Sequence, residues 1–442
     1  MAAQLSLGIA LSLALLALAW AQKWPEEEDA LHKHYSLITD WPSHSARFNI
    51  SAECGRSGNR SRLRWAYFTR HSGTLWDWIA VADHLNIPWT RIQNRNLWEL
   101  VDHRAAPDTY VSTQAVAAAK WRGMGQLMCH MADVLVVADV VPDSRPLLLG
   151  NCTTPTLLLV TNRFDVGVRE DHAGYYKFMA EVVQRPWVWV VVNNPYDAHY
   201  MKSKGLVLPP DRTFLLRPVG ASFLPKPDPA SAAPRAGMIA LIEHPGKPHL
   251  ELLHILPWLK EKNLLPYVSI IDRMYGGPAV LSHFRGVIQV PYQVSVMKMY
   301  ESMFYGAVFV VPSHTFMVQL LKDHEHMAFC CRPFMEQHPD TWQEVVDWYN
   351  PDYVEGHVLF NSWDELAQIL KGEGPFTPAF FSAKAAASRR LMAASRRRSL
   401  EGYRTLTQRM EAQSCELLKS EDLWPPRYTT AWERSLRRRP WN

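Results

Sequence analysis

Two polar side chains that could move a proton follow apolar runs in the first half of the chain. His71 comes shortly after the run 63–68, and Asp165 comes shortly after the run 155–160. An imidazole or a carboxylate in such a place can act as a general base toward a hydroxyl group. The alternative is that each is an ordinary polar loop residue. We treat His71 and Asp165 as the two candidate catalytic bases.

Three further side chains in this half follow apolar runs in the same way and could bind an anion or a sugar hydroxyl. A guanidinium matches the geometry of phosphate, and an amide can pair with hydroxyl groups. The alternative for each is a role in capping a loop. These candidates for the acceptor or for a phosphate are Arg163, Asn193 and Arg217.

The segment 286–313 contains the most informative spacing of the second half. An apolar run leads to Gln293 and Ser295, a helical pattern then carries Glu301, and an apolar strand pattern follows Gly306. Ser is a good N-cap residue, and the N-terminus of a helix favours phosphate groups. Glu301 lies about two turns further on, where an apolar helix does not otherwise need a carboxylate.

This segment resembles the donor-binding half of the GT-B fold glycosyltransferases. The resemblance implies that Ser295 lies near the phosphates of a nucleotide sugar and that Glu301 lies near its ribose. Many retaining members carry two Glu residues in this pattern, whereas this chain has Gln293 at the first position. The stereochemistry of transfer therefore stays open. The alternative is that Gln293 and Glu301 are ordinary loop and helix-surface residues.

The other donor-binding candidates follow strands of the second half. By the same resemblance, Lys247 is a basic residue that meets the diphosphate, and Arg273 belongs to the same site. The pair Gly276 and Gly277 would let the backbone approach a ligand closely, although a plain glycine turn fits equally well. The donor set is therefore Lys247, Arg273, Gly276, Gly277, Gln293, Ser295 and Glu301.

The elements that must position these residues alternate between strands and helices. Apolar strand patterns separated by helical patterns are typical of parallel sheets covered on both faces. Four prolines within 225–234 interrupt this alternation, which then restarts. We expect an α/β protein with two Rossmann-like parallel-sheet domains facing a cleft, the GT-B arrangement, and a C-terminal helical segment. The alternative is one large α/β domain with a proline-rich surface loop.

The expected boundaries follow from these patterns. Helix-forming residues dominate 379–419, with arginine clusters that predict a solvated basic face, or a patch for anionic lipid or a partner. The predicted segments are a signal peptide or signal anchor at 1–21, a lead-in at 22–61, an acceptor-side domain at 62–224, a linker at 225–235, a nucleotide-sugar domain at 236–378 and a basic closing segment at 379–442.

The N-terminus predicts a secretory address. An apolar run covers 5–18, and Ala19-Trp20-Ala21 follows as a small-x-small cleavage pattern. Three N-glycosylation sequons agree with this route, at Asn49, Asn59 and Asn151. The chain has six cysteines, which an oxidising lumen would allow to pair, and the adjacent Cys330 and Cys331 are not expected to pair with each other. We expect the lumen of the Golgi or endoplasmic reticulum, or secretion.

Composition narrows the functional classes. With 442 residues, 48% apolar types and a net charge of +4, the chain is neither disordered nor fibrous, and it lacks the basic field of a nucleic-acid binder. It has no Asp-x-Asp triad, so no metal is expected. No cofactor is expected either, because a nucleotide sugar is a substrate.

We therefore expect a glycosyltransferase that moves a sugar from a nucleotide sugar to a glycan, protein or lipid acceptor. A non-catalytic two-domain carbohydrate-binding protein and a pseudoenzyme acting as a partner are the alternatives.

Overall fold

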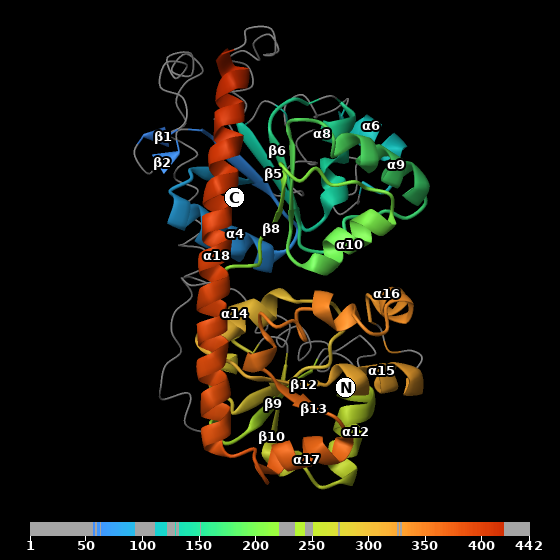
Figure 1. Cartoon of the computed structure of the whole chain (residues 1–442), viewed down its shortest axis with the longest axis vertical. Helices are drawn as coiled ribbons and strands as arrows, with labels where there is room; N and C mark the ends of the chain where they lie inside the picture. Colours follow the sequence, from blue (N-terminus) through green and yellow to red (C-terminus); the bar gives the residue numbers. More distant parts are fainter. Residues whose placement is uncertain are drawn as a thin grey trace, which may run out of the picture.

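The computed structural model describes residues 56–57, 60–61, 63–92, 111–121, 129, 132–150, 152–220, 235–243, 251–272, 275–324, 327 and 329–419. Within them lie two large sheets and the helices that cover them (Figure 1).

The first domain is built on a six-stranded parallel sheet with the order β4-β3-β5-β6-β7-β8. Its central strands are buried on both faces, which explains their uninterrupted apolar sequences. The strands are β3 (Trp65–Phe68), β4 (Trp89–Ile92), β5 (Val134–Ala138), β6 (Thr156–Val160), β7 (Val188–Val192) and β8 (Thr213–Leu215). The helices include α4 (Ser72–Leu85), α6 (Gln114–Lys120), α8 (Arg145–Leu149), α9 (His172–Val182) and α10 (Pro195–Ser203).

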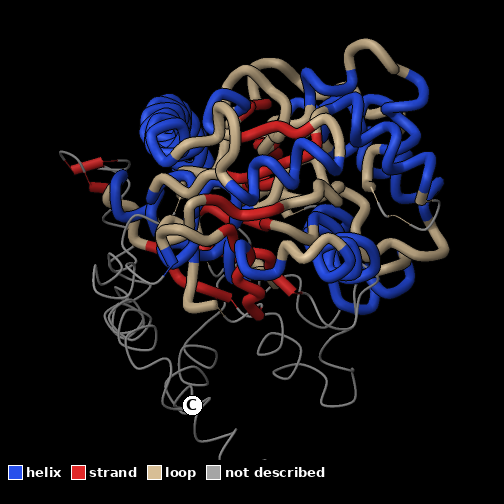
Figure 2. The backbone as a smooth tube through the Cα atoms, turned by 90° about the horizontal axis from the view of Figure 1, so that it is seen from below, coloured by secondary structure: helices blue, strands red, loops and turns tan. Residues whose placement is uncertain are grey.

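The second domain repeats this design with a five-stranded parallel sheet of order β10-β9-β11-β12-β13. Its strands are β9 (Ile239–Glu243), β10 (Val268–Asp272), β11 (Gly286–Ile288), β12 (Phe309–Pro312) and β13 (Val358–Phe360). The helices include α12 (Leu256–Glu261), α13 (Pro278–Leu281), α14 (Met297–Tyr305), α15 (His314–Asp323), α16 (Arg332–Gln337) and α17 (Trp363–Lys371). Figure 2 shows the strands in the middle with helices around them.

The two sheets share one topology. In each, the second strand in the sequence lies outside the first, and the chain then crosses to the other side of the first strand. This reversal creates a switch point between β3 and β5 in the first domain, and between β9 and β11 in the second. Ligands of open parallel sheets bind outside the carboxyl ends of the strands at such points. The expected pair of Rossmann-like domains is therefore confirmed.

One long helix, α18 (Pro378–Lys419), runs along both domains (Figure 1). Phe381 and Met392 belong to the core of the second domain, whereas Tyr403 and Met410 belong to the core of the first. Its apolar residues therefore join the two domains. The sequence left open one long helix or two consecutive ones, and the structure has one.

The expected solvated basic face of this helix is present, because Arg389, Arg390, Arg397, Arg398 and Arg404 are exposed, and two further arginines contact the first domain. Arg396 donates to the backbone oxygens of Val219 and Gly220, at 2.9 and 3.1 Å. Arg409 donates to the backbone oxygen of Asp211. Because a guanidinium carries five donors, one arginine can pair with more than one backbone carbonyl group. The positive charge of α18 is thus mostly exposed to solvent, and part of it binds backbone carbonyl groups of the first domain.

The structure tests part of what the sequence predicted about cysteine pairing. Cys129 and Cys152 form a disulfide, and Cys330 and Cys331 are free thiols, so the prediction that these two do not pair with each other is confirmed. In the part of the chain that the structure describes, there is no helix of sufficient length and apolar character to cross a membrane.

Candidate active site

His71 lies at the carboxyl end of β3, at the switch point of the first domain. Its loop is held by two threonines: the His71 N–H donates to the Thr69 hydroxyl at 3.1 Å, and the Thr74 hydroxyl donates to the His71 carbonyl at 2.9 Å. The His71 side chain is exposed. The backbone is thus fixed while the imidazole stays accessible to a ligand.

Asp139 lies beside His71 at the end of the neighbouring strand, β5. Burial raises the pKa of its carboxyl, and the interaction with His71 opposes this shift. Its backbone has φ 68°, a left-handed conformation that is uncommon for residues other than glycine and is often found at functional sites. Our sequence reasoning missed Asp139, although it follows an apolar strand just as His71 does.

A second pair of charged residues stabilises the loops at the carboxyl ends of β3 and β5. Arg70, next to His71, contacts the carboxylate of Asp143 with both Nε and Nη2, at 2.7 and 2.9 Å. A bidentate pair of this kind fixes the geometry of both side chains. It therefore ties the loop after β3 to the segment after β5, between which His71 and Asp139 lie.

Gly73 brings the His71 loop against the second domain. An ideal Cβ at Gly73 would lie 2.9 Å from Cε1 of His71 and 3.1 Å from Cβ of Met297, which is the first residue of α14. A side chain here would collide with both neighbours. The candidate base and the first residue of the helix that the sequence assigned to the donor therefore both lie against Gly73.

The donor loop, which we define as residues 292–295, is anchored within its own domain through its backbone. The Cys330 N–H donates to Tyr292 O at 3.1 Å, the Trp348 indole donates to Gln293 O at 3.0 Å, and the Asp347 N–H donates to Val294 O at 3.0 Å. These bonds leave the side chain of Gln293 half-buried at the loop.

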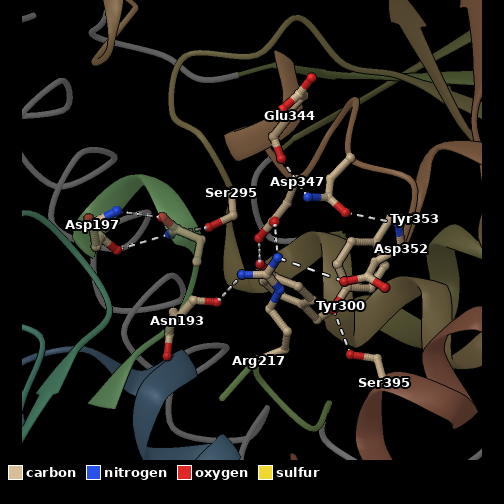
Figure 3. Close-up of polar contacts among 12 residues, drawn as sticks. Asn193, Asp197, Arg217, Ser295, Tyr300, Glu344, Asp347, Asp352, Tyr353 and Ser395 are labelled. Atoms are coloured by element: carbon tan, nitrogen blue, oxygen red, sulfur yellow. Dashed lines mark hydrogen bonds and ion pairs between the residues drawn. The ribbon is translucent and has the colours of Figure 1, made fainter. Parts of the chain in front are cut away.

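Ser295 does not cap α14 as its sequence suggested. The N-cap is Val296, which has no side chain that could accept a hydrogen bond, and the helix begins at Met297. The Ser295 hydroxyl instead accepts a hydrogen bond from Asn194 Nδ2 of the first domain at 3.3 Å (Figure 3). The competing partner across the domain boundary explains the difference, because a hydroxyl that is engaged there turns away from its own helix.

Glu301 lies one turn after Met297 on α14. Burial raises the pKa of Glu301 to about 8, and the nearby carboxyl of Asp77 on α4 adds to the effect. Among the described residues, no hydrogen-bond donor to its carboxyl is found. A carboxyl in such surroundings gains stability when hydroxyl groups donate to it.

The loop after β10 approaches the same carboxyl. Glu301 contributes to the raised pKa of Tyr275, which lies before Gly276 and Gly277. Both glycines have left-handed backbones, with φ 95° and 96°. The structure therefore brings Gly276, Gly277 and Glu301 into one region.

The other candidates of the first domain are engaged with protein groups. The Asp165 carboxylate accepts hydrogen bonds from the hydroxyls of Tyr176 and Tyr200, at 2.6 and 2.8 Å. The Arg163 guanidinium donates to Asn162. The Arg217 guanidinium donates to the backbone oxygen of Asn193 at 2.9 Å and pairs with Asp347 of the second domain (Figure 3).

Some predicted residues lie outside the described part of the chain, namely Lys247, Arg273 and the sequon positions Asn49, Asn59 and Asn151. Among the described residues, no group of three or more His, Cys, Asp or Glu side chains is placed to hold a metal ion.

The two Rossmann-like domains, with their carboxyl edges meeting and a C-terminal helix joining them, have the GT-B architecture. No family model and no curated protein matches this sequence.

Solved structures with a similar arrangement include a glycotransferase, a protein in complex with UDP-glucose and an epimerase. The glycotransferase of kitacinnamycin is 12% identical, with 78% of this chain and 98% of that chain covered and a TM-score of 0.42. Anabaena HepE in complex with UDP-glucose is 12% identical, with 81% and 99% covered and a TM-score of 0.42. The UDP-GlcNAc 2-epimerase of Methanocaldococcus jannaschii is 11% identical, with 75% and 98% covered and a TM-score of 0.36.

Proposed function

We propose that this protein is a glycosyltransferase that moves a sugar from a nucleotide sugar to a hydroxyl group of an acceptor. The observation that carries the proposal is that His71 and Met297, the first residue of α14, both lie against Gly73. A base on one domain and an anion-favouring helix terminus on the other are the two parts that such a transfer needs.

Each part has a defined role in the reaction. The acceptor oxygen attacks the anomeric carbon of the donor, the bond to the nucleoside diphosphate breaks, and the acceptor proton passes to His71. Asp139 orients the imidazole and stabilises its positive charge, as a carboxylate beside a histidine does. The donor loop and the N-terminus of α14 bind the departing diphosphate, and Glu301 accepts hydrogen bonds from sugar hydroxyls.

His71 fits the role of base better than Asp165 does. Two tyrosine hydroxyls already donate to the Asp165 carboxylate, so it has fewer lone pairs left for an acceptor hydroxyl. His71 keeps an exposed ring beside a carboxyl.

Four tryptophans of the described residues give no support to a non-catalytic sugar receptor. Stacking on a sugar ring requires an exposed aromatic face, whereas Trp65, Trp78, Trp342 and Trp348 are fully buried in the cores. The large number of tryptophans thus serves packing at these positions.

We place the reaction in the lumen of the secretory pathway. The apolar run at 5–18 and the sequons favour this address, and the disulfide between Cys129 and Cys152 is typical of an oxidising compartment. Digestion of the expressed protein with an endoglycosidase tests it: a smaller mass is expected, and an unchanged mass in secretory cells contradicts it.

A panel of nucleoside diphosphates tests the activity. We expect UDP, GDP, CDP or ADP to raise the melting temperature, and the matching nucleotide sugars to release the diphosphate when an acceptor library is added. Release that survives EDTA would agree with the expected independence from metal. A flat thermal response to the whole panel contradicts the proposal.

A further inference from the structure

Arg217 reaches from the first domain into the interior of the second. It follows β8, and its Nη2 lies 2.9 Å from Oδ1 of Asp347, with 7% and 0% of the two side chains exposed. Nη1 of the same guanidinium holds the backbone oxygen of Asn193 at the end of β7. Figure 3 shows Arg217 between groups of the two domains. The pair is therefore a buried ion pair across the domain boundary.

Asp347 is at the same time bonded to the donor loop and to α14. Its N–H donates to Val294 O at 3.0 Å, and its carboxylate accepts the hydroxyl of Tyr300 on α14. The next residue, Trp348, donates to Gln293 O. One short segment, 347–348, thus connects Arg217 with the loop and the helix that we assign to the donor.

A buried ion pair is a weak source of stability, because removing two charges from water costs about as much as their attraction returns. Apolar residues would join two domains at least as well. A charged pair differs in one respect: each partner becomes solvated again when the domains separate. Arg217 and Asp347 therefore suit a contact that forms on domain closure.

The contacts of Arg217 also argue against a role in binding phosphate. Its guanidinium faces the Asn193 carbonyl and Asp347, and it lies over the ring of Tyr353 at 6.0 Å. The groups around it come from the protein and are fixed in place. The ion pair with Asp347 links the guanidinium to the donor loop.

We propose that Arg217 and Asp347 are positioning residues, whose ion pair on domain closure fixes the donor loop in the conformation that binds the nucleotide. The proposal rests on the glycosyltransferase function proposed above. Neither residue touches the donor: the ion pair acts through the bonds of segment 347–348 to Val294 and Gln293.

Two single variants test the ion pair. Asp347→Asn keeps the N–H bonded to Val294 and a partner for Tyr300 while it removes the charge, and Arg217→Met removes the guanidinium. We expect each to raise KM for the donor by about tenfold or more and to leave KM for the acceptor within about twofold. Arg217→Lys, which keeps the charge, should restore part of the loss. Equal effects on both KM values, or no effect on either, overturn the proposal.

The matched control is Arg390→Ala, which removes the exposed pair between Arg390 and Glu355. Exposed pairs contribute little, so this variant should keep wild-type constants. The double variant Arg217→Met/Asp347→Asn should lose less than the product of the single losses, because neither charge is then left buried alone. Independent losses contradict the pairing.

Hydrogen exchange on the nucleotide-free protein separates this proposal from the proposed function. Peptides covering 289–296 should exchange about tenfold faster in Asp347→Asn than in the wild type, while peptides of the β5–β6 core keep their rates. Unchanged exchange at 289–296 overturns the proposal, even if the wild type binds UDP. Faster exchange in a protein that binds no nucleoside diphosphate would instead sink the proposed function and keep the coupling. If Arg217→Met does not fold, Arg217→Lys and Asp347→Asn supply the same measurement.

Discussion

In the first domain, the carboxyl ends of β3 and β5 carry His71 and Asp139, whereas in the second domain the ends of β10 and β11 lead to Gly276, Gly277 and the donor loop. The strand order is the same in both sheets. The first edge thus offers groups that exchange protons, and the second offers backbone and one isolated carboxyl. The comparison shows that one strand order can serve two chemical roles, because the loops at the carboxyl edge can differ in sequence while the buried strands keep the same arrangement.

The largest expected effect comes from removing the base from the first domain. His71→Ala should lower kcat by about 10²- to 10⁴-fold, the usual contribution of general base catalysis. The melting shift caused by the nucleoside diphosphate should persist, because the donor site lies on the other domain.

Steady-state rates and thermal shifts on the same preparation check this prediction, with the exposed His172→Ala as control. Loss of nucleotide binding in His71→Ala would contradict the separation of the two roles.

A substitution at Asp139 tests whether the carboxyl edge of the first sheet has a residue that favours catalysis but lowers the folding stability. Asp139→Gly removes both the carboxyl and the side chain that disfavours φ 68°, so it should stabilise the fold by about 1 kcal/mol. The same variant should lower kcat by about tenfold or more, because His71 loses its partner. Urea unfolding and rate measurements check both signs. A variant that is both less stable and fully active would refute this role.

The second domain is tested through Glu301. Glu301→Ala should weaken binding of the nucleoside diphosphate by about tenfold, which corresponds to the loss of one hydrogen bond. Calorimetric titration measures this, and Glu261→Ala, at the exposed C-terminal end of α12, is the control. An unchanged affinity would remove Glu301 from the donor site.

The smallest effect concerns pH. Because the pKa of Glu301 is raised to about 8 in the folded protein from an ordinary value of 4.5, the folded state holds a proton that the unfolded state has lost. The wild type therefore loses stability as pH rises from about 4.5 to about 8. Relative to the wild type, Glu301→Gln should gain a few degrees in melting temperature at pH 9 and nothing at pH 4. A difference that is constant with pH would show that burial does not raise this pKa.

The fold was largely predictable, because apolar runs such as 155–160 have one stable outcome, a strand buried on both faces. The contacts that α18 makes with both domains could not be predicted. Its arginines form a charge pattern that fits water as well as it fits carbonyl groups, and only the arrangement of the domains shows which partner is present. Asp139 could have been predicted from the sequence as a candidate site residue, since it follows an apolar strand. The bond between Asn194 and Ser295 was not, because its partners lie 101 positions apart in different domains.

The path of α18 also constrains how the two domains can move. The chain passes between them twice, once through 221–234 and once along this helix, which is anchored at Met392 in one core and at Tyr403 in the other. A continuous helix resists twisting and stretching and bends most readily where few apolar contacts hold it. Leu400 also belongs to the core of the first domain. Opening of the cleft should therefore be a rotation about one axis near residues 393–399, and a rigid-body slide of one domain past the other would have to break the helix.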